Sequence, residues 1–449
     1  MQEALLGGRD AASTPNPSGE QAGSELARSG AARMRLADRS QVQMQMCSLD
    51  ELVPVDHQVR MVWDAVCQMD LSAFVASIRA REFTEGRSAN DVRVMVGLWL
   101  WAAVNNVARG RVLARLCERD ITYKWMCGGL SMNYHTLNDF RVEHQSALDQ
   151  LFTATLGRLM HGGLVSVTRI SQDGLRVRAS AGAGSFHRRP TLQKCLAEAE
   201  AHLADLKKLA DSPDREGIEE PDHAHQAVAA ADRLERVKAA LSELSKIEAA
   251  KAKSHDKKKE RPGRASTTDP QARVMKMPNG GFNPAYNVQL ASDPISRAIV
   301  GVMVSNSGAD APLSEPMRQQ VQQRTGQKVS EHLIDGGYVN LDAINRAAEQ
   351  HVAVYMPVPE PNQKSKAADR FERRADDSDA VADWRRRMNS EQAQEIYQQR
   401  ASTSETINAD VRTYRGMSPL AVRGIAKATC VALWSALAYN LLHFARALS

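Results

Sequence analysis

The spacing of apolar residues separates the chain into a helical first part and a mixed second part. From residue 52 to about residue 159, apolar side chains recur every three or four positions, as they do along one face of a helix. Ser88 and Asp91 mark a helix start ahead of "VRVMVGLWLWAAV". "RVLARLCERD", a Gly-Gly break and "NYHTLNDFRVEH" then form a helix, a turn and a polar helix. The pattern predicts an all-α domain over residues 38–162, and its last helices fit either a DNA-binding pair or ordinary helix packing.

The second part changes to short apolar runs typical of strands. "LVSVTRISQDGLRVRASAG" predicts two strands joined near Asp173-Gly174, and "RVMKM", "AYNVQLAS" and "RAIVGVMVS" predict an antiparallel meander. Helices are expected at 312–323 and 341–349, each beside a strand ("HLID" and "VAVYMPV"), and again from about Ser390 to the apolar C-terminal segment. Strands followed by alternating strands and helices predict an α/β domain over residues 163–449, with a mixed sheet covered by helices.

A helical hairpin and a basic linker interrupt this second part over residues 190–264. Its two apolar series keep the alternating spacing of three and four residues that forms a coiled-coil seam, and "DSPDREGIEEPD" breaks the helix between them. The series comprise Leu192, Leu196, Ala199, Leu203, Leu206 and Ala210, then Ala227, Ala230, Leu234, Val237, Leu241 and Leu244.

Composition narrows the class of protein. With 449 residues, 43% of them hydrophobic and 25% charged, the chain fits a soluble globular protein of two or three domains. Residues 1–37 are rich in Gly, Ala, Ser and Arg and predict a disordered tail, not a signal peptide. The apolar C-terminal segment contains Tyr439, Asn440 and His443, which favours a packed helix over a membrane span. The cysteines lack zinc-ligand spacing, which predicts a reduced, cytoplasmic protein.

Positive charge is concentrated in one stretch. The formal net charge is +5, and "KAKSHDKKKERPGR" at 251–264 alone carries seven Lys or Arg against two acids, a net of +5 as well. Such a run fits a solvated linker or a contact to a polyanion.

Two aspartates share a local pattern that suggests chemistry. Asp173 and Asp335, the latter in "EHLIDGGYVN", each follow an apolar strand and precede glycine. Either one alone fits a turn. Two such aspartates on one sheet edge fit a metal site, because two-metal phosphodiester chemistry requires several carboxylates around hard Mg²⁺ ions. A helix beside the strands would then supply a third acid, and Glu405 is the candidate, although alone it would be taken for a surface residue.

These motifs, in this order, resemble the RNase H-like DDE transposases of bacterial insertion sequences, most closely the group numbered eleven eighty-two. The resemblance runs from about Asp38 to the end of the chain, through "SLDELVPVDHQVR", "HTLNDFRVEH", "ISQDG", "STTDPQARVMKMPNGGFNPAYNVQL", "IDGGY" and "IYQQRASTSETINADVRTYRG". It implies an RNase H-like catalytic domain in which Asp173, Asp335 and Glu405 form the catalytic and metal-binding triad.

The resemblance also implies an activity and partners. Two Mg²⁺ ions, which Mn²⁺ can replace, would support endonuclease cleavage at the element's ends and strand transfer into target DNA. The partners would be double-stranded DNA and further copies of the chain, as a homodimer or larger assembly, without a membrane. The location would be the bacterial cytoplasm and, with DNA bound, the nucleoid. The expected DNA contacts are Asn138, Arg141, His187, Arg188, Arg189, Lys257, Lys258, Lys259, Tyr397, Arg400 and Arg412.

One spacing departs from the family's pattern. Related groups show Tyr, two residues, Arg, three residues, Glu, six residues and Lys. Here Tyr397, Arg400, Glu405 and Arg412 are separated by two, four and six residues. On an ideal helix Arg400 would lie about 140° from Glu405. Either the helix is irregular there, or Arg400 does not share the site.

Two other functions remain compatible with the same residues. The chain could be a catalytically inactive DNA-binding derivative of a transposase, or a structure-specific nuclease of the same fold. The first would bind element ends without cutting them, and the second would cut branched DNA whatever its end sequence.

Overall fold

The computed structural model describes residues 38–448 except 43, 45, 79, 81–87, 211–219, 254–261 and 361–368. Contacts along the chain define two units, residues 1–47 and residues 48–449. The predicted disordered tail, residues 1–37, lies outside the described residues. The second unit contains both the helical part and the sheet.

The first part of this unit is helical, as the apolar spacing predicts. Asp91 caps α4 by accepting a hydrogen bond from the amide of Arg93, which confirms the predicted helix start. The bounds are α2 (Gln58–Cys67), α3 (Ser72–Ala76), α4 (Val92–Val104), α5 (Gly110–Arg119), α6 (Ile121–Met126), α7 (Tyr134–Glu143) and α8 (Gln145–His161).

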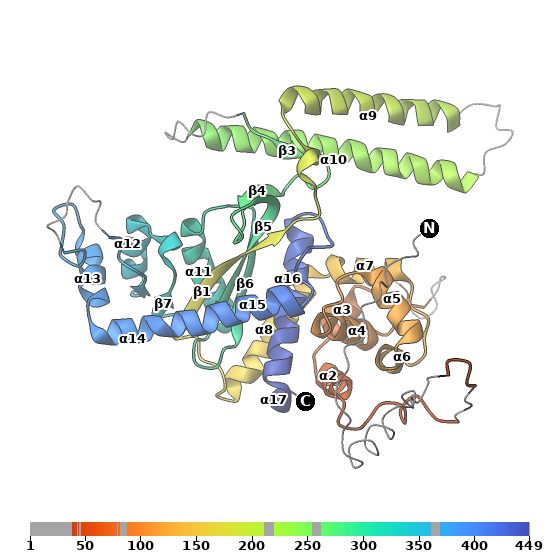
Figure 1. Cartoon of the computed structure of the whole chain (residues 1–449), viewed down its shortest axis with the longest axis horizontal. Coiled ribbons are helices and arrows are strands. Elements are labelled where there is room, and N and C mark those ends of the chain that lie inside the picture. The colour runs from red at the N-terminus through yellow and green to blue at the C-terminus, as the bar shows by residue number, and fades with distance from the viewer. Residues whose placement is uncertain are drawn as a thin grey trace, which may run out of the picture. The chain divides into compact units, whose positions relative to one another are not determined.

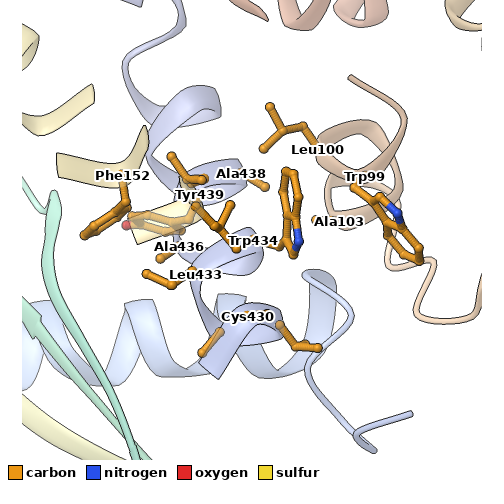
Figure 2. Close-up of a cluster of buried hydrophobic side chains, with 14 of the residues drawn as sticks. Trp99, Leu100, Ala103, Phe152, Cys430, Leu433, Trp434, Ala436, Ala438 and Tyr439 are labelled. Carbon is orange, nitrogen blue, oxygen red and sulfur yellow. The ribbon is translucent and has the colours of Figure 1, made fainter. Parts of the chain in front are cut away.

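The C-terminal helix α16 (Ile425–His443) joins this helical part to the sheet. Figure 2 shows Trp434 of α16 among apolar side chains from α4 and α8, including Trp99 and Phe152. On the sheet side, Asn440 accepts a hydrogen bond from the amide of Ile299 and donates one to its carbonyl oxygen. Both parts therefore share one core through α16, and the boundary at residue 162 stays a prediction.

Helix α16 is also long and apolar enough to span a bilayer. Its apolar window is 72% buried inside the protein, as expected for a core helix. Among the described residues it is the one helix that passes this test.

The second part contains a mixed sheet with the order β4-β5-β1-β7-β8, and β6 pairs with β5 (Figure 1). Strands β4, β5 and β6 are antiparallel to their neighbours, which confirms the predicted meander, whereas β1, β7 and β8 run parallel. The bounds are β1 (Arg169–Arg178), β4 (Arg273–Lys276), β5 (Phe282–Ser292), β6 (Ile299–Ser305), β7 (Glu331–Leu333) and β8 (Ala353–Tyr355).

Helices accompany the parallel strands. Helix α12 keeps the predicted bounds, and Ser390 caps α14 as expected. The helices are α11 (Ser314–Thr325), α12 (Leu341–Glu349), α13 (Asp379–Met388), α14 (Glu391–Arg400), α15 (Thr406–Tyr414) and α17 (Ala445–Leu448).

One local prediction is wrong, and one helix was not predicted. The segment around Asp173-Gly174 is one continuous strand, β1, because its residues pair without interruption to β5 from Ser171 through Arg178. The charged stretch before residue 390 contains helix α13, whose apolar face buries Val381, Trp384 and Met388 beneath a surface of arginines and acids.

The hairpin consists of α9 (Arg189–Ala210) and α10 (Glu220–Ala252), which lie side by side (Figure 1). Leu192, Ala199, Leu206, Leu234 and Leu244 are buried, all at predicted seam positions. At its base, β2 (Phe186–His187) pairs antiparallel with β3 (Ala265–Ser266). The hairpin is thus stabilised by a narrow apolar seam of its own.

Candidate functional site

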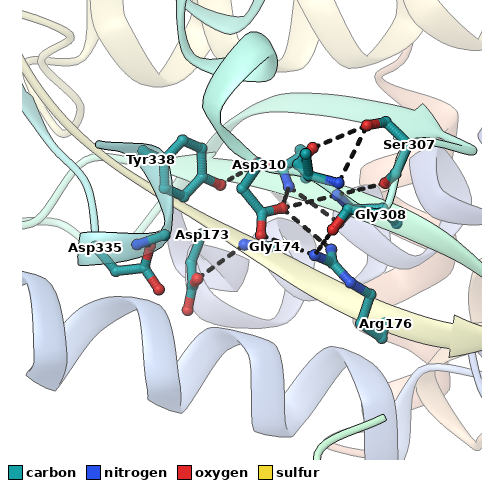
Figure 3. Close-up of polar contacts among 12 residues, drawn as sticks. Asp173, Gly174, Arg176, Ser307, Gly308, Asp310, Asp335 and Tyr338 are labelled. Atoms are coloured by element: carbon teal, nitrogen blue, oxygen red, sulfur yellow. Dashed lines mark hydrogen bonds and ion pairs between the residues drawn. The ribbon is translucent and has the colours of Figure 1, made fainter. Parts of the chain in front are cut away.

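The register of the parallel strands places Asp173 and Asp335 at the same level of the sheet. Strands β1 and β7 pair Ser171 with Leu333, and each aspartate follows its paired residue by two positions. Side chains alternate between the faces of a sheet with a period of two, so both aspartates continue the same face. Figure 3 shows the two carboxylates next to each other, beside the long helix that passes below the strands.

Each carboxylate is also fixed by a local hydrogen bond. Asp173 accepts from the amide of Gly174 (2.8 Å) and from Nδ2 of Asn408 on α15 (3.1 Å). Asp335 caps the short turn η4 (Gly336–Tyr338) and accepts from the amide of Gly337 (2.8 Å). The first aspartate is held by a strand and a helix, and the second by the turn that follows its strand.

Arg400 lies between the two carboxylates. Its Nη2 is 3.4 Å from Asp173 Oδ1 and 3.7 Å from Asp335 Oδ2. Both distances exceed those of a normal charge-assisted hydrogen bond, and the buried Nε of Arg400 has no partner. The guanidinium therefore balances the two negative charges without binding either one tightly.

The helix that carries Arg400 is irregular. Between α14 and α15 the chain forms a π turn, η6 (Ala401–Glu405). A π turn accommodates one more residue than an α turn, so the helix departs from the ideal geometry on which the 140° separation was calculated. Arg400, Ser404 and Asn408 all contact β1, since the Ser404 hydroxyl lies 2.7 Å from that of Ser171. The helix is therefore irregular at this point, and Arg400 lies beside the two aspartates.

Burial and charge act in opposite directions at this site. Burial raises the pKa of Asp173 above its ordinary value, while the nearby Arg400 guanidinium opposes that rise. Burial likewise raises the pKa of Tyr397, which lies close enough to Arg400 for that charge to oppose the shift. Asp173 has 19% of its side chain exposed, against 40% for Asp335. The Arg400 guanidinium thus favours the ionised form of Asp173, the more enclosed of the two aspartates.

The opposite face of β1 carries a polar network that supports the site. Asp310 accepts from Arg176 (2.8 Å), Asn287 (2.7 Å) and Gln289 (2.8 Å). Figure 3 shows the contact between Asp310 and Arg176. A Cβ on Gly174 would lie 2.5 Å from Gln289 Nε2 and 2.8 Å from Asp310 Oδ1. Glycine at 174 is therefore required by this close approach.

Glu405 is not among the groups that contact the two aspartates. It is exposed at the end of the π turn, and no hydrogen bond or ion pair joins its carboxylate to another described residue. The described residues contain no group of three or more His, Cys, Asp or Glu side chains placed to hold a metal ion. The structure brings together two of the three predicted acids, and these two oxygen donors are the groups that could hold a divalent cation.

The two predicted DNA-reading residues of α7 differ in exposure. Asn138 is exposed. Arg141 is 6% exposed, donates to the carbonyl oxygen of Ala108 and stacks over Trp99, with its guanidinium carbon 4.6 Å from the ring centre. Burial lowers the pKa of Arg141 to about 10. The Arg141 side chain thus packs in the helical core, and its contact with DNA stays a prediction.

The other predicted DNA contacts lie in varied surroundings. Arg188 is exposed and His187 half-buried, whereas Arg189 binds Glu248 of α10 (2.6 Å) and closes the base of the hairpin. Arg412 is half-buried on α15. The basic-run residues Lys257, Lys258 and Lys259 lie outside the described residues.

Three residues of the site have no counterpart in the sequence-based prediction. Asn408 is found only when the helix is placed on β1, although its four-residue spacing from Ser404 and Arg400 indicates a shared helix face. Asp310 and Arg176 pair across 134 residues of sequence. An acid in the Ser-Gly loop after the third meander strand was the available indication for Asp310.

Two family models match the chain. Residues 47–143, which contain the helices from α2 to α7, match the family described as Transposase domain (DUF772). Residues 360–445, which contain Glu405 and Arg400, match the Transposase DDE domain. Asp173 and Asp335 lie between the two matched segments. The comparisons with curated proteins and with solved structures give no match. The two family matches indicate a DDE-type transposase family.

Proposed function

We propose that the protein is an insertion-sequence transposase of the group numbered eleven eighty-two, which binds the terminal inverted repeats of its element and catalyses metal-dependent DNA cleavage and strand transfer. The observation that carries the proposal is the parallel register that aligns Asp173 with Asp335 beside Arg400. The transposase domains matched on both sides of these residues support it.

The residues of the site suit a divalent cation in part. Asp173 and Asp335 offer the hard oxygen donors that Mg²⁺ or Mn²⁺ prefers. The guanidinium of Arg400, loosely paired with both through Nη2, holds positive charge where the two carboxylates converge. Glu405 would complete the set. A bound metal pair would supply Lewis-acid stabilisation to the attacking and leaving oxygens of a phosphodiester.

The side chains of the chain itself have separate tasks in this proposal. Asn408 and the Gly174 amide orient the Asp173 carboxylate, and the turn η4 orients Asp335. Arg400 lowers the cost of two adjacent negative charges. Tyr397 and Arg412, on the same irregular helix, would contact the DNA backbone beside the acids. RNase H-like geometry, a homodimer or larger assembly, and cleavage at element ends belong to the same proposal.

Nicking of end-containing DNA tests the proposal. The purified full chain is expected to cut a duplex that carries the element's inverted repeat in Mg²⁺, and not in EDTA. Asp335→Ala should abolish cutting while DNA binding persists. Equal cutting by Asp335→Ala would contradict the assignment, and cutting of branched DNA whatever its ends would indicate a structure-specific nuclease.

One observation favours the second candidate function, a catalytically inactive DNA-binding derivative: Glu405 is exposed and does not contact the aspartate pair. Glu405→Gln separates the two. An active transposase should lose nicking with this variant, whereas an inactive derivative shows no metal-dependent nicking before or after the change and keeps its affinity for the ends.

A further inference from the structure

A groove between the helical part and the segment before α16 has the chemistry of a phosphate-binding surface. It encloses about 970 Å³, with α5 and α7 on one wall and residues 418–427 on the other. The end of β1, at Ala179 and Ser180, closes it. Arg423 also lines two further hollows, of about 540 and 230 Å³, beside α10.

The exposed charges of the groove are almost all positive. Arg109, Arg111, Arg423 and Lys427 line it as exposed side chains, against the single acid Asp139. The guanidinium of Arg111 lies over the ring of Tyr134 at 4.7 Å. Within the described part of the chain, Arg109, Arg423 and Lys427 have no ion-pair partner, although the charge of Arg423 acts on the carboxyl of Asp269. Surface arginines elsewhere, such as Arg93 and Arg346, bind acids. Unpaired cations gathered from two distant segments attract a polyanion.

The two walls are fixed to each other by hydrogen bonds. Arg415 donates to the carbonyl oxygen of Val104 (3.1 Å), and the Gly416 amide donates to Asn106 Oδ1 (2.9 Å). The Leu420 amide donates to the carbonyl oxygen of Arg178 at the end of β1 (3.0 Å). The groove is therefore built before any ligand arrives, which lowers the entropic cost of binding.

The floor is shaped by a glycine. Gly110 is buried, and a Cβ there would lie 2.4 Å from Asn138 Oδ1 and 3.1 Å from the carbonyl oxygen of Tyr134. Because Gly110 has no Cβ, α7 can pack closely on α5. The exposed amide of Asn138 therefore lies in the same groove as the cations. An amide beside cations fits a duplex, because Asn reads base edges while Arg and Lys hold phosphates.

We propose that this groove, through Arg109, Arg423 and Lys427, binds the phosphate backbone of duplex DNA and leads it toward Asp173. The inference rests on the proposed function for the identity of the polyanion. Strand β1 connects the two places: six residues at about 3.3 Å each separate Ala179 from Asp173 by roughly 20 Å. That length corresponds to about six base pairs of a duplex, at 3.4 Å per pair.

The test measures DNA binding without cleavage. Full-length wild type, Arg423→Ala/Lys427→Ala and Arg109→Gln are titrated with a labelled duplex of arbitrary sequence in EDTA, by fluorescence anisotropy at several NaCl concentrations. The slope of log K against log salt should become less negative by about 2 for the double variant and by about 1 for Arg109→Gln. The matched control is Lys328→Ala/Arg446→Ala, which removes two exposed positive charges outside the groove and should keep the wild-type slope.

The outcomes separate this inference from the proposed function. Wild-type slopes for both groove variants, in chains with unchanged melting temperature, would overturn it. Weaker binding to RNA with unchanged binding to duplex DNA would overturn it as well. Reduced slopes in a chain that never nicks DNA would leave the groove established while the catalytic proposal fails. Metal-dependent nicking with unchanged slopes would support the catalytic proposal and overturn the groove.

Discussion

Each aspartate of the carboxylate pair is followed by a glycine, but the two Asp-Gly dipeptides have different structural roles. At Asp173-Gly174 the chain continues through β1, and the missing side chain of glycine admits Gln289 and Asp310 against the strand. At Asp335-Gly336 the chain leaves β7, Asp335 caps a turn, and a Cβ on Gly336 would meet nothing within 4 Å. Packing therefore requires glycine at position 174. At position 336, neither packing nor backbone conformation requires it.

The two aspartates differ in the same way. Asp173, on β1, is half-buried against α15; Arg400 opposes the rise in its pKa and Asn408 donates a hydrogen bond to its carboxylate. Asp335 stands at a more exposed turn. A shared role in cation binding should therefore appear in activity, while stability and pH dependence should distinguish the two positions.

The largest effect is expected when either carboxylate is neutralised. Asp173→Asn and Asp335→Asn should each lower the nicking rate by about 100-fold or more, because a lost metal ligand removes several kcal/mol of transition-state stabilisation. Asp376→Asn, at an exposed aspartate outside the site, should keep the wild-type rate. The rate is measured as nicked product per time on end-containing duplex. A wild-type nicking rate for one of the two site variants would contradict a shared role of Asp173 and Asp335 in metal binding.

The next effect separates the two glycines. Gly174→Ala should destabilise the fold by about 1–3 kcal/mol, because its Cβ overlaps a hydrogen-bonded network that has little room to shift. Gly336→Ala should change the free energy of unfolding by no more than about 0.5 kcal/mol. Urea unfolding followed by circular dichroism measures both. Equal losses for the two variants would contradict the assignment of different roles.

A smaller change is expected in pH dependence. Burial raises the pKa of Asp173 and Arg400 opposes that rise, so Arg400→Gln should let the pKa increase further. Because the ionised carboxylate is the form that holds a cation, the acidic limb of the nicking pH profile should move to higher pH. Arg386→Gln, 77% exposed on α13, serves as the control and should leave the limb in place. An unmoved limb in Arg400→Gln would show that Asp173 ionises independently of this arginine.

Much of the fold follows from local patterns, because a helix or strand buries residues at its own period. The meander, α12 and the hairpin seam were predictable for this reason. The continuity of β1 was not: Asp-Gly is typical of turns, and only the neighbouring Gln289 and Asp310 show why a glycine stands inside a strand. Helix α13 was missed because its arginines and acids obscure a buried face of Val381, Trp384 and Met388.

In the candidate site, too, local sequence features were predictable and contacts between distant segments were not. The aspartates were found from sequence because a strand followed by Asp-Gly is a local feature. The partners Asn408 and Asp310 were not, because each meets β1 across more than a hundred residues. The exposure of Asn138 and the burial of Arg141, three positions apart on one helix, likewise depend on Trp99 and α16, which a single helix pattern does not specify.

The smallest expected effect tests how the second Asp-Gly connects to the network behind the first. Tyr338, three residues after Asp335, is buried, and its hydroxyl donates to Gln289 Oε1. Tyr338→Phe removes that bond, but Gln289 Oε1 still accepts from Gln172 Nε2 (2.7 Å), so no buried acceptor loses every partner. The free energy of unfolding should fall by about 1 kcal/mol in urea titrations, as for one ordinary hydrogen bond. Tyr414→Phe, at a 59% exposed ring, should cause no measurable change. An unchanged stability for Tyr338→Phe would mean that the turn after β7 and the network on β1 are mechanically independent, and that the two Asp-Gly pairs meet only through Arg400.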